Sequence, residues 1–219
     1  MFLRKRFLKE PFKGSGDYWE RRYQAAGHSG SGSYGQLAEF KAEVLNGFVR
    51  EHGIETVMEH GCGDGNQLQL ADYPAYVGYD VSRTALGHCR KLFASDSSKE
   101  FRHVDDYDGA QADLALSLDV IYHLVEDETF DAHMKRLFES ARRFAIIYSS
   151  DIDEPYREGS HVRNRAFTKW IEENRPPFTL ERHIPNRYPF DGEVKTGSMS
   201  DFFIYRRIAD GTPVPGEAD

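Results

Sequence analysis

The sequence has few of the features that mark secreted, metal-binding or membrane-spanning proteins. Among its 219 residues only two are cysteines, Cys62 and Cys89, too few for a disulfide framework or a cysteine-based zinc site. No apolar run approaches the roughly 20 residues that span a bilayer, and none follows the N-terminus as a secretory signal would require. We therefore expect a cytoplasmic protein without a transmembrane segment and without a bound metal.

Positive charge is also scarce. The chain has 28 Lys and Arg residues against 36 Asp and Glu, a formal net charge of -8. An acidic surface repels phosphates, so DNA is not an expected partner. The exception is the basic N-terminus, which could contact an anionic membrane or a phosphate-bearing substrate, or remain a solvated tail. Its cations are Arg4, Lys5, Arg6 and Lys9.

What the sequence does contain is an alternation of predicted strands and helices. Apolar residues from 37 to 52 have the spacing of an amphipathic helix, which Gly53 ends. The alternation predicts an α/β fold, a Rossmann-like three-layer sandwich whose mostly parallel seven-stranded sheet ends in an antiparallel C-terminal hairpin. Strands are predicted at 56–58, 76–79, 101–104, 114–118, 144–148, 180–183 and 202–205, with further helices at 82–93, 128–140 and 162–173.

The first 36 residues differ from the rest in composition. They are rich in Gly and Ser, yet Trp19, Tyr23 and Tyr34 flank these runs, and a plain linker would not need such aromatics. We interpret residues 1–36 as a cap or lid over a site, with a passive ordered extension as the alternative. Residues 37–219 then form a single domain.

The most informative segment is the glycine-rich turn from Glu59 to Asn66, which follows a predicted strand. Glycine lets a ligand approach the main chain closely, and such a turn between a strand and a helix is typical of sites for nucleoside-bearing cofactors. The pyrophosphate version of the turn needs a third Gly or Ala where this chain has Asn66. NAD is therefore disfavoured.

The pattern Glu59-x-Gly61-x-Gly63-x-Gly65 resembles motif I of the class I S-adenosylmethionine-dependent methyltransferases. The resemblance covers residues 37–150 and extends to the terminal hairpin by topology. It implies that Asp80, at the end of the second strand, binds the ribose hydroxyls, since a carboxylate can accept both hydrogen bonds. It also implies that Asp105 or Asp106 contacts the adenine amino group.

The same resemblance implies that S-adenosylmethionine is the cofactor and that the segment from Leu118 to Leu124 lines the methyl-transfer site. The cofactor-binding residues it indicates are Glu59, His60, Gly61, Cys62, Gly63, Asn66, Asp80, Val81, Asp105, Asp106, Leu118 and Asp119.

A catalytic base is predicted at His123. A hydroxyl acceptor is a better nucleophile once it has lost its proton, and histidine titrates near neutral pH. His123 follows the fourth strand, at the rim of the expected site. The alternative is a histidine that only packs beside the cofactor. Candidate acceptor-binding residues are Tyr18, Trp19, Tyr122, His161 and Tyr188.

Two further groups allow alternative interpretations. Arg163 and Arg165 could contact an anionic or sugar-like acceptor, or form a solvated helix face. The acidic residues Asp151, Asp153 and Glu154 would be the first place to look for a metal, although loops in this position are often acidic without one.

The function predicted from the resemblance is transfer of a methyl group to a small molecule or sugar, at oxygen. The alternatives are methylation of RNA or another macromolecule, and a cofactor-binding module without catalysis. One class of base methylation is excluded, because Asp119-Val120-Ile121-Tyr122 stands where that class has the [N/D]-P-P-[Y/F] tetrad for a flipped base.

Overall fold

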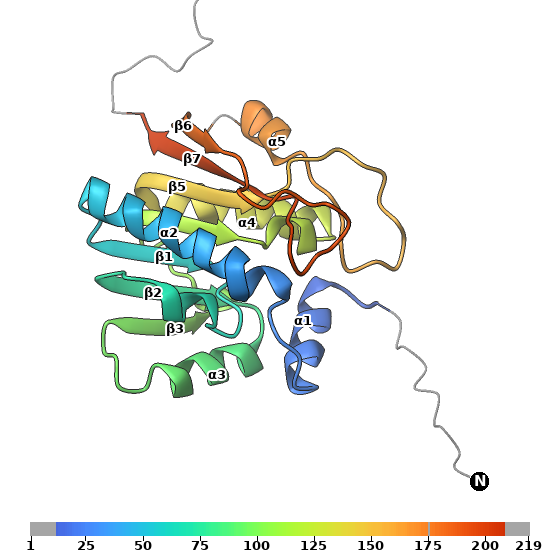
Figure 1. Cartoon of the computed structure of the whole chain (residues 1–219), viewed down its shortest axis with the longest axis horizontal. Helices are drawn as coiled ribbons and strands as arrows, with labels where there is room; N and C mark the ends of the chain where they lie inside the picture. The colour runs from blue at the N-terminus through green and yellow to red at the C-terminus, as the bar shows by residue number, and fades with distance from the viewer. Residues whose placement is uncertain (1–11, 175, 209–219) are drawn as a thin grey trace, which may run out of the picture.

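The computed structural model describes residues 12–174 and 176–208, and within them seven strands form one sheet. The strand order is β3-β2-β1-β4-β5-β7-β6, and only β7 runs against the others (Figure 1). The predicted fold class is confirmed. The strands are β1 (Thr56–His60), β2 (Ala75–Asp80), β3 (Lys99–His103), β4 (Ala112–Leu118), β5 (Ala141–Ser149), β6 (Phe178–Ile184) and β7 (Asp201–Arg207).

Helices cover both faces of the sheet, giving three layers (Figure 1). Helices α2 (Gly35–His52) and α3 (Arg83–Leu92) pack on one face, where Phe48 and Leu86 join the apolar side chains of β1, β4 and β5. Helices α4 (Asp127–Ser140) and α5 (Phe167–Asn174) pack on the other, around Met134 and Phe167.

The topology places the expected site. Strand β1 pairs in parallel with β2 on one side and with β4 on the other, so chain connections leave β1 and β4 toward opposite halves of the sheet. In open α/β sheets, ligands bind at the carboxyl ends of the strands where the order reverses in this way. The turn from Gly61 to Gly65 follows β1 at that point.

The predicted boundaries hold for most elements, with two differences. The cap segment contains a helix, α1 (Ser15–Gln24), that its composition did not indicate. The helix predicted at 162–173 begins instead at Phe167, where the Asp151 carboxylate accepts hydrogen bonds from the backbone N–H and hydroxyl of Thr168. The preceding residues form a loop held by Arg165, described below.

The C-terminal hairpin is part of the main sheet. β7 pairs antiparallel with β5 over six residues and with β6 on its other side. Phe202 on β7 is completely buried, and its ring contacts Phe40 of α2 and Tyr148 of β5. This contact attaches the hairpin to the core.

In the parts of the chain that the structure describes, no helix has the length and apolar character to cross a bilayer. The basic residues Arg4, Lys5, Arg6 and Lys9 lie outside the described residues, as do the first residues of the predicted cap and the chain after residue 208.

Replacing Phe202 with Ala is expected to lower the free energy of unfolding by about 3–5 kcal/mol, because a buried ring is lost and a cavity is left behind. Urea denaturation measures the change. Leu180→Ala in β6 is the control, because Leu180 is 48% exposed and its truncation should cost much less. Equal losses at the two positions would contradict the hairpin's attachment through Phe202.

Candidate functional site

A cavity of about 460 Å³ lies at the carboxyl ends of β1, β2 and β4. Its walls come from the glycine turn, from the residues after these strands, from α4 and from the cap segment. This volume is within the roughly 300–1,000 Å³ of small-molecule sites.

The glycine turn has a backbone shape and a closeness of packing that require glycine. Gly61 has φ 97°, and a Cβ there would lie 2.4 Å from Cγ2 of Val120. Gly63 has φ 57°, and a Cβ there would lie 2.4 Å from Oγ of Ser29. The side chains of Val120 and Ser29 thus occupy the space that a Cβ would need, and both glycines line the cavity.

Asp80 joins the end of β2 to the turn. One carboxylate oxygen accepts from the backbone N–H of Gly63 at 2.9 Å and the other from that of Ser82 at 2.8 Å. Burial raises the pKa of Asp80, while these two hydrogen bonds act against the rise. Each oxygen keeps acceptor capacity for a ligand, because a carboxylate has about four acceptor sites.

Glu59 is buried beside the turn. Its Oε2 accepts from the hydroxyl of Tyr76 at 2.7 Å, and burial raises the pKa of Glu59 to about 7. The positive charge of Lys41 acts against this rise. The side chain is thus close to half-protonated at neutral pH.

Lys41 is a site residue that the sequence analysis missed. Its side chain is 1% exposed, and Nζ donates to Oδ2 of Asp119 at 2.7 Å. Asp119 has φ 58°, unusual outside glycine, and its Oδ1 accepts from the hydroxyls of Tyr122 and Ser200. A signal existed: Lys41 lies four residues after Leu37 and four before Leu45, on the buried stripe of α2.

The cavity wall also contains Val104, Asp105 and two buried histidines. Nε2 of His60 contacts Oγ of Ser140 at 2.9 Å, and Nε2 of His133 contacts Oγ of Ser117 at 2.8 Å. Burial lowers the pKa of both histidines, to about 3 for His133. Both rings are therefore neutral at physiological pH.

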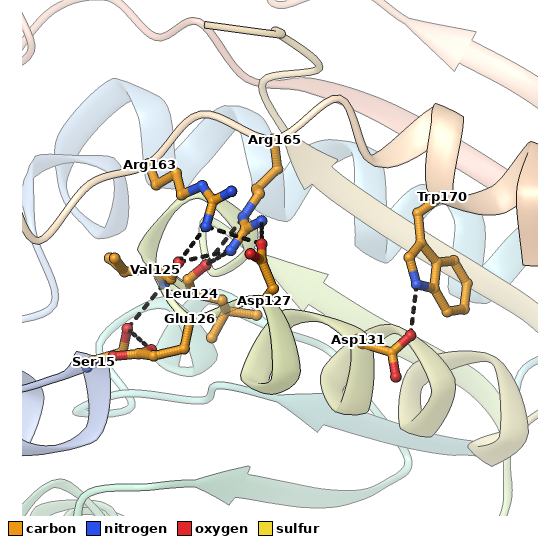
Figure 2. A network of polar contacts seen from close by, with 9 residues as sticks. All are labelled: Ser15, Leu124, Val125, Glu126, Asp127, Asp131, Arg163, Arg165 and Trp170. Atoms are coloured by element: carbon orange, nitrogen blue, oxygen red, sulfur yellow. Dashed lines mark hydrogen bonds and ion pairs between the residues drawn. The ribbon is translucent and has the colours of Figure 1, made fainter. Parts of the chain in front are cut away.

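The segment predicted to be a cap lines part of the cavity, and hydrogen bonds hold it in place at three points. Glu20 of α1 accepts from the hydroxyls of Ser82 and Thr84 at the start of α3. Ser15 donates through its N–H and hydroxyl to Glu126, just before α4 (Figure 2).

The third fastening is at the glycine turn. The N–H of Ser29 donates to Asp64, and the Ser29 hydroxyl accepts from the N–H of Asp64. The cap thus contacts both helices that flank the cavity and the turn itself.

Arg163 and Arg165 lie before α5, in the loop that leads to it. Arg165 is buried, and its guanidinium donates to the carbonyls of Leu124 and Val125 and pairs with Asp127 (Figure 2). Arg163 pairs with the same carboxylate. The two arginines fix the segment after His123, so the interpretation as a solvated helix face is wrong for Arg165.

Four predicted acceptor-binding residues form one aromatic cluster with His123. The ring of Tyr18 stacks on His161 with centroids 4.3 Å apart, and the ring of Trp19 meets His123 edge-on at 4.8 Å. The ring of Tyr122 also packs against His123, with centroids 4.6 Å apart. The fifth, Tyr188, lies apart, against Phe40 of α2.

His123 presents a basic nitrogen. Its Nδ1 lies 3.2 Å from the carbonyl oxygen of His161, and because a carbonyl only accepts, Nδ1 carries the proton. Nε2 then has the free lone pair. Burial lowers the pKa of His123 to about 4, so the ring is neutral at physiological pH.

Most of the predicted cofactor residues line the cavity, and two do not. Asn66 donates from its side chain to the carbonyl of Ser33, and Asp106 lies outside the wall that Asp105 joins. The predicted residues on the wall are Glu59, His60, Gly61, Cys62, Gly63, Asp80, Val81, Asp105, Leu118 and Asp119.

The acidic residues after β5 have structural partners. Asp151 caps α5, Asp153 pairs with Lys169, and Glu154 accepts from the side chain of Asn164. No group of His, Cys, Asp or Glu side chains within residues 12–174 and 176–208 has an arrangement that could hold a metal ion.

We compared the chain with known protein families, curated proteins and solved structures. No family model matches the chain. It is 29% identical to a small RNA 2'-O-methyltransferase of Arabidopsis thaliana, over 79% of this chain and 23% of that protein. The chain thus spans about a quarter of the curated relative's length.

Three solved structures resemble the whole fold. The N-methyltransferase NodS of Bradyrhizobium japonicum, in complex with S-adenosyl-L-homocysteine (SAH), has a TM-score of 0.63 and 12% identity, and the match covers 89% of this chain and 98% of that one. The methyltransferase domain of bacterial CtHen1-C has a TM-score of 0.61 and 19% identity, with coverage of 80% and 100%. The magnesium protoporphyrin IX methyltransferase of Synechocystis with bound SAH has a TM-score of 0.60 and 16% identity, with coverage of 87% and 97%.

The raised pKa of the buried Glu59 carboxyl predicts that the stability of the protein depends on pH. Its pKa is raised in the folded state from 4.5 to about 7, so its contribution to stability is complete below pH 4.5 and is lost as the pH rises toward 7. Glu59→Gln removes this term while keeping an acceptor for Tyr76. Between pH 5 and 8 the variant is expected to gain on the order of 3 kcal/mol relative to the wild type. Urea denaturation across that range measures it; parallel curves would contradict the raised pKa.

Proposed function

We propose that this protein, which has the fold of the class I S-adenosylmethionine-dependent methyltransferases, binds S-adenosylmethionine and transfers its methyl group to a small molecule or a sugar, at oxygen. The observation that carries the proposal is the direct contact between the glycine turn and Asp80 on the cavity wall. We also infer that the protein works in the cytoplasm, where its two unpaired thiols would stay reduced.

The residues present fit this cofactor. A nucleoside lying along the turn would meet the backbone of Gly61 and Gly63, which lie on the cavity wall. Its ribose hydroxyls would find the two Asp80 oxygens, which the N–H groups of Gly63 and Ser82 hold in place. Its adenine would lie toward Val104 and Asp105.

The charge of the cavity suits a cationic ligand. Carboxylates outnumber lysine and arginine on its wall, and a sulfonium is attracted to such surroundings. The acidic residues on the wall are Glu59, Asp64, Asp80, Asp105, Asp119 and Glu128, against Lys41 and Arg136.

The bound cofactor would supply an electrophilic methyl group, and the protein would position the acceptor and move a proton. His123 Nε2 has the lone pair to accept the acceptor's hydroxyl proton, because Nδ1 is committed to the carbonyl of His161. Trp19 lies on the cavity wall with His123 and would offer an aromatic surface for a sugar or another flat acceptor.

RNA is the second candidate acceptor, because the Arabidopsis relative is a small RNA 2'-O-methyltransferase. The net charge of -8 opposes it, since binding along a phosphate backbone depends on Lys and Arg contacts. An acceptor panel should therefore contain sugars, small phenols and alcohols, and a short RNA. We expect turnover on the uncharged hydroxyl compounds; turnover on RNA alone would replace the proposed acceptor class.

Asp80→Asn is expected to weaken binding of S-adenosylhomocysteine by about 10- to 100-fold, because hydrogen bonds to a charged group are replaced by neutral ones. Calorimetry with S-adenosylmethionine, S-adenosylhomocysteine and NAD measures this. Asp72→Asn is the matched control, since Asp72 is 80% exposed and outside the cavity. The proposal would be refuted if the protein bound NAD alone, or if wild type and Asp80→Asn bound S-adenosylhomocysteine with equal affinity.

His123→Asn is expected to lower kcat by about 10²- to 10⁴-fold while the affinity for S-adenosylhomocysteine stays within a few-fold of wild type. Because the pKa of His123 is about 4, wild-type kcat should fall only as the pH drops toward 4. His183→Asn, on exposed β6, is the control and should keep full activity. Retained turnover in His123→Asn would remove it as the base.

A further inference from the structure

The two residues after His123 depend on a distant side chain for their conformation. Leu124 and Val125 belong to no helix or strand, so their carbonyl groups have no place in a backbone hydrogen-bond ladder. Such groups need another donor when they are shielded from water. Nη2 of Arg165 donates to both carbonyls, at 2.8 Å each. Arg165 lies 40 positions further along the chain than Val125.

The guanidinium of Arg165 is buried, and all three of its nitrogens donate. Nε donates to the carbonyl of Leu124 at 3.2 Å, and Nη1 pairs with Asp127 at the start of α4 (Figure 2). The group also lies over the ring of Phe130, 4.7 Å from its centroid. A planar guanidinium serves several acceptors in fixed directions, which the ammonium of lysine does not. Because burying a cation is costly, this arrangement is weak evidence for stabilisation and stronger evidence for placement.

The loop that carries Arg165 also contacts His123 and its neighbour on the other side. The backbone N–H of Arg163 donates to the carbonyl of Tyr122 at 2.8 Å. The carbonyl oxygen of His161 lies 3.2 Å from Nδ1 of His123. Since these contacts come from one loop, a guanidinium that holds this loop against the chain after His123 also holds the His161 carbonyl against the ring.

The cap contacts the same short segment from the opposite direction. Oγ of Ser15 accepts from the N–H of Val125 at 3.0 Å, and Ser15 itself donates to Glu126. Figure 2 shows Ser15 below the segment and the two arginines above it. A substitution at Arg165 therefore removes the contacts with the loop and leaves those with the cap.

We propose that Arg165 is a positioning residue for His123. By joining the loop of residues 161–165 to the chain after His123, it keeps the His161 carbonyl at Nδ1 and so leaves the lone pair on Nε2. The inference rests on the proposed function, in which that lone pair takes the proton of the acceptor. Arg165 is not part of the cavity wall, so it acts through His123 and its neighbours.

The test reads the tautomer of His123 directly. The NMR chemical shifts of the ring nitrogens distinguish the Nδ1–H from the Nε2–H form, and His123→Asn assigns the signals. In the free wild-type protein we expect the Nδ1–H form. In Arg165→Gln the ratio of Nδ1–H to Nε2–H should fall by about five-fold or more, the effect of losing one neutral hydrogen bond. The affinity for S-adenosylhomocysteine should stay within a few-fold of wild type.

Arg207→Gln is the matched control. Arg207 likewise donates to two backbone carbonyls, those of Phe138 and Ala141, and lies over the ring of Phe178, 4.7 Å from its centroid. These contacts are at the end of α4 and the start of β5, and Arg207 is not part of the cavity wall. A general loss of stability would appear in both variants, whereas the change of tautomer should appear only in Arg165→Gln.

The possible results separate the two proposals. An unchanged ratio in Arg165→Gln, an equal change in Arg207→Gln, or a wild type with its proton on Nε2 would overturn the role of Arg165. If Arg165→Gln does not fold, Arg165→Lys is measured instead, and it should shift the ratio in the same direction because lysine cannot serve all three acceptors. Failure of the wild type to bind S-adenosylhomocysteine would refute the proposed function, while the tautomer of the free protein still decides the role of Arg165.

Discussion

The carboxylate of Asp80 is the contact on which the geometry of the cavity depends. It links the ends of β1 and β2 by accepting one backbone N–H from the glycine turn and one from the start of α3. With both oxygens held, the carboxylate has a fixed orientation, although burial opposes its charge. The cavity wall is thereby formed before any ligand arrives, which reduces the entropy lost on binding.

Around this contact, the protein gathers buried polar groups whose protonation states follow from their surroundings. Burial makes His60, His123 and His133 neutral and raises the pKa of Glu59 to about 7. The tautomer of His123 follows from a single carbonyl. Groups with perturbed pKa values that converge on a cavity are typical of functional sites.

Much of the core could be predicted from the sequence, because its signals are local. The apolar run of β4 and the glycine turn after β1 carry their own geometry, since parallel strands need apolar side chains on both faces and the turn needs positive φ. The helix in the cap and the start of α5 were not predictable in this way. They depend on Glu20, Asp151 and Arg165 meeting partners far along the chain.

The backbone of Asp119 is conformationally strained, and this strain limits which substitutions the position can accept. A residue with a side chain at φ 58° is held in a conformation that glycine adopts freely. Glycine would relax the main chain there, yet it would remove the carboxylate on which Lys41, Tyr122 and Ser200 converge. Efforts to raise thermostability by replacing residues that have unfavourable backbone torsions should therefore leave Asp119 unaltered. The residue with the strained φ also carries the carboxylate that the three neighbours bind.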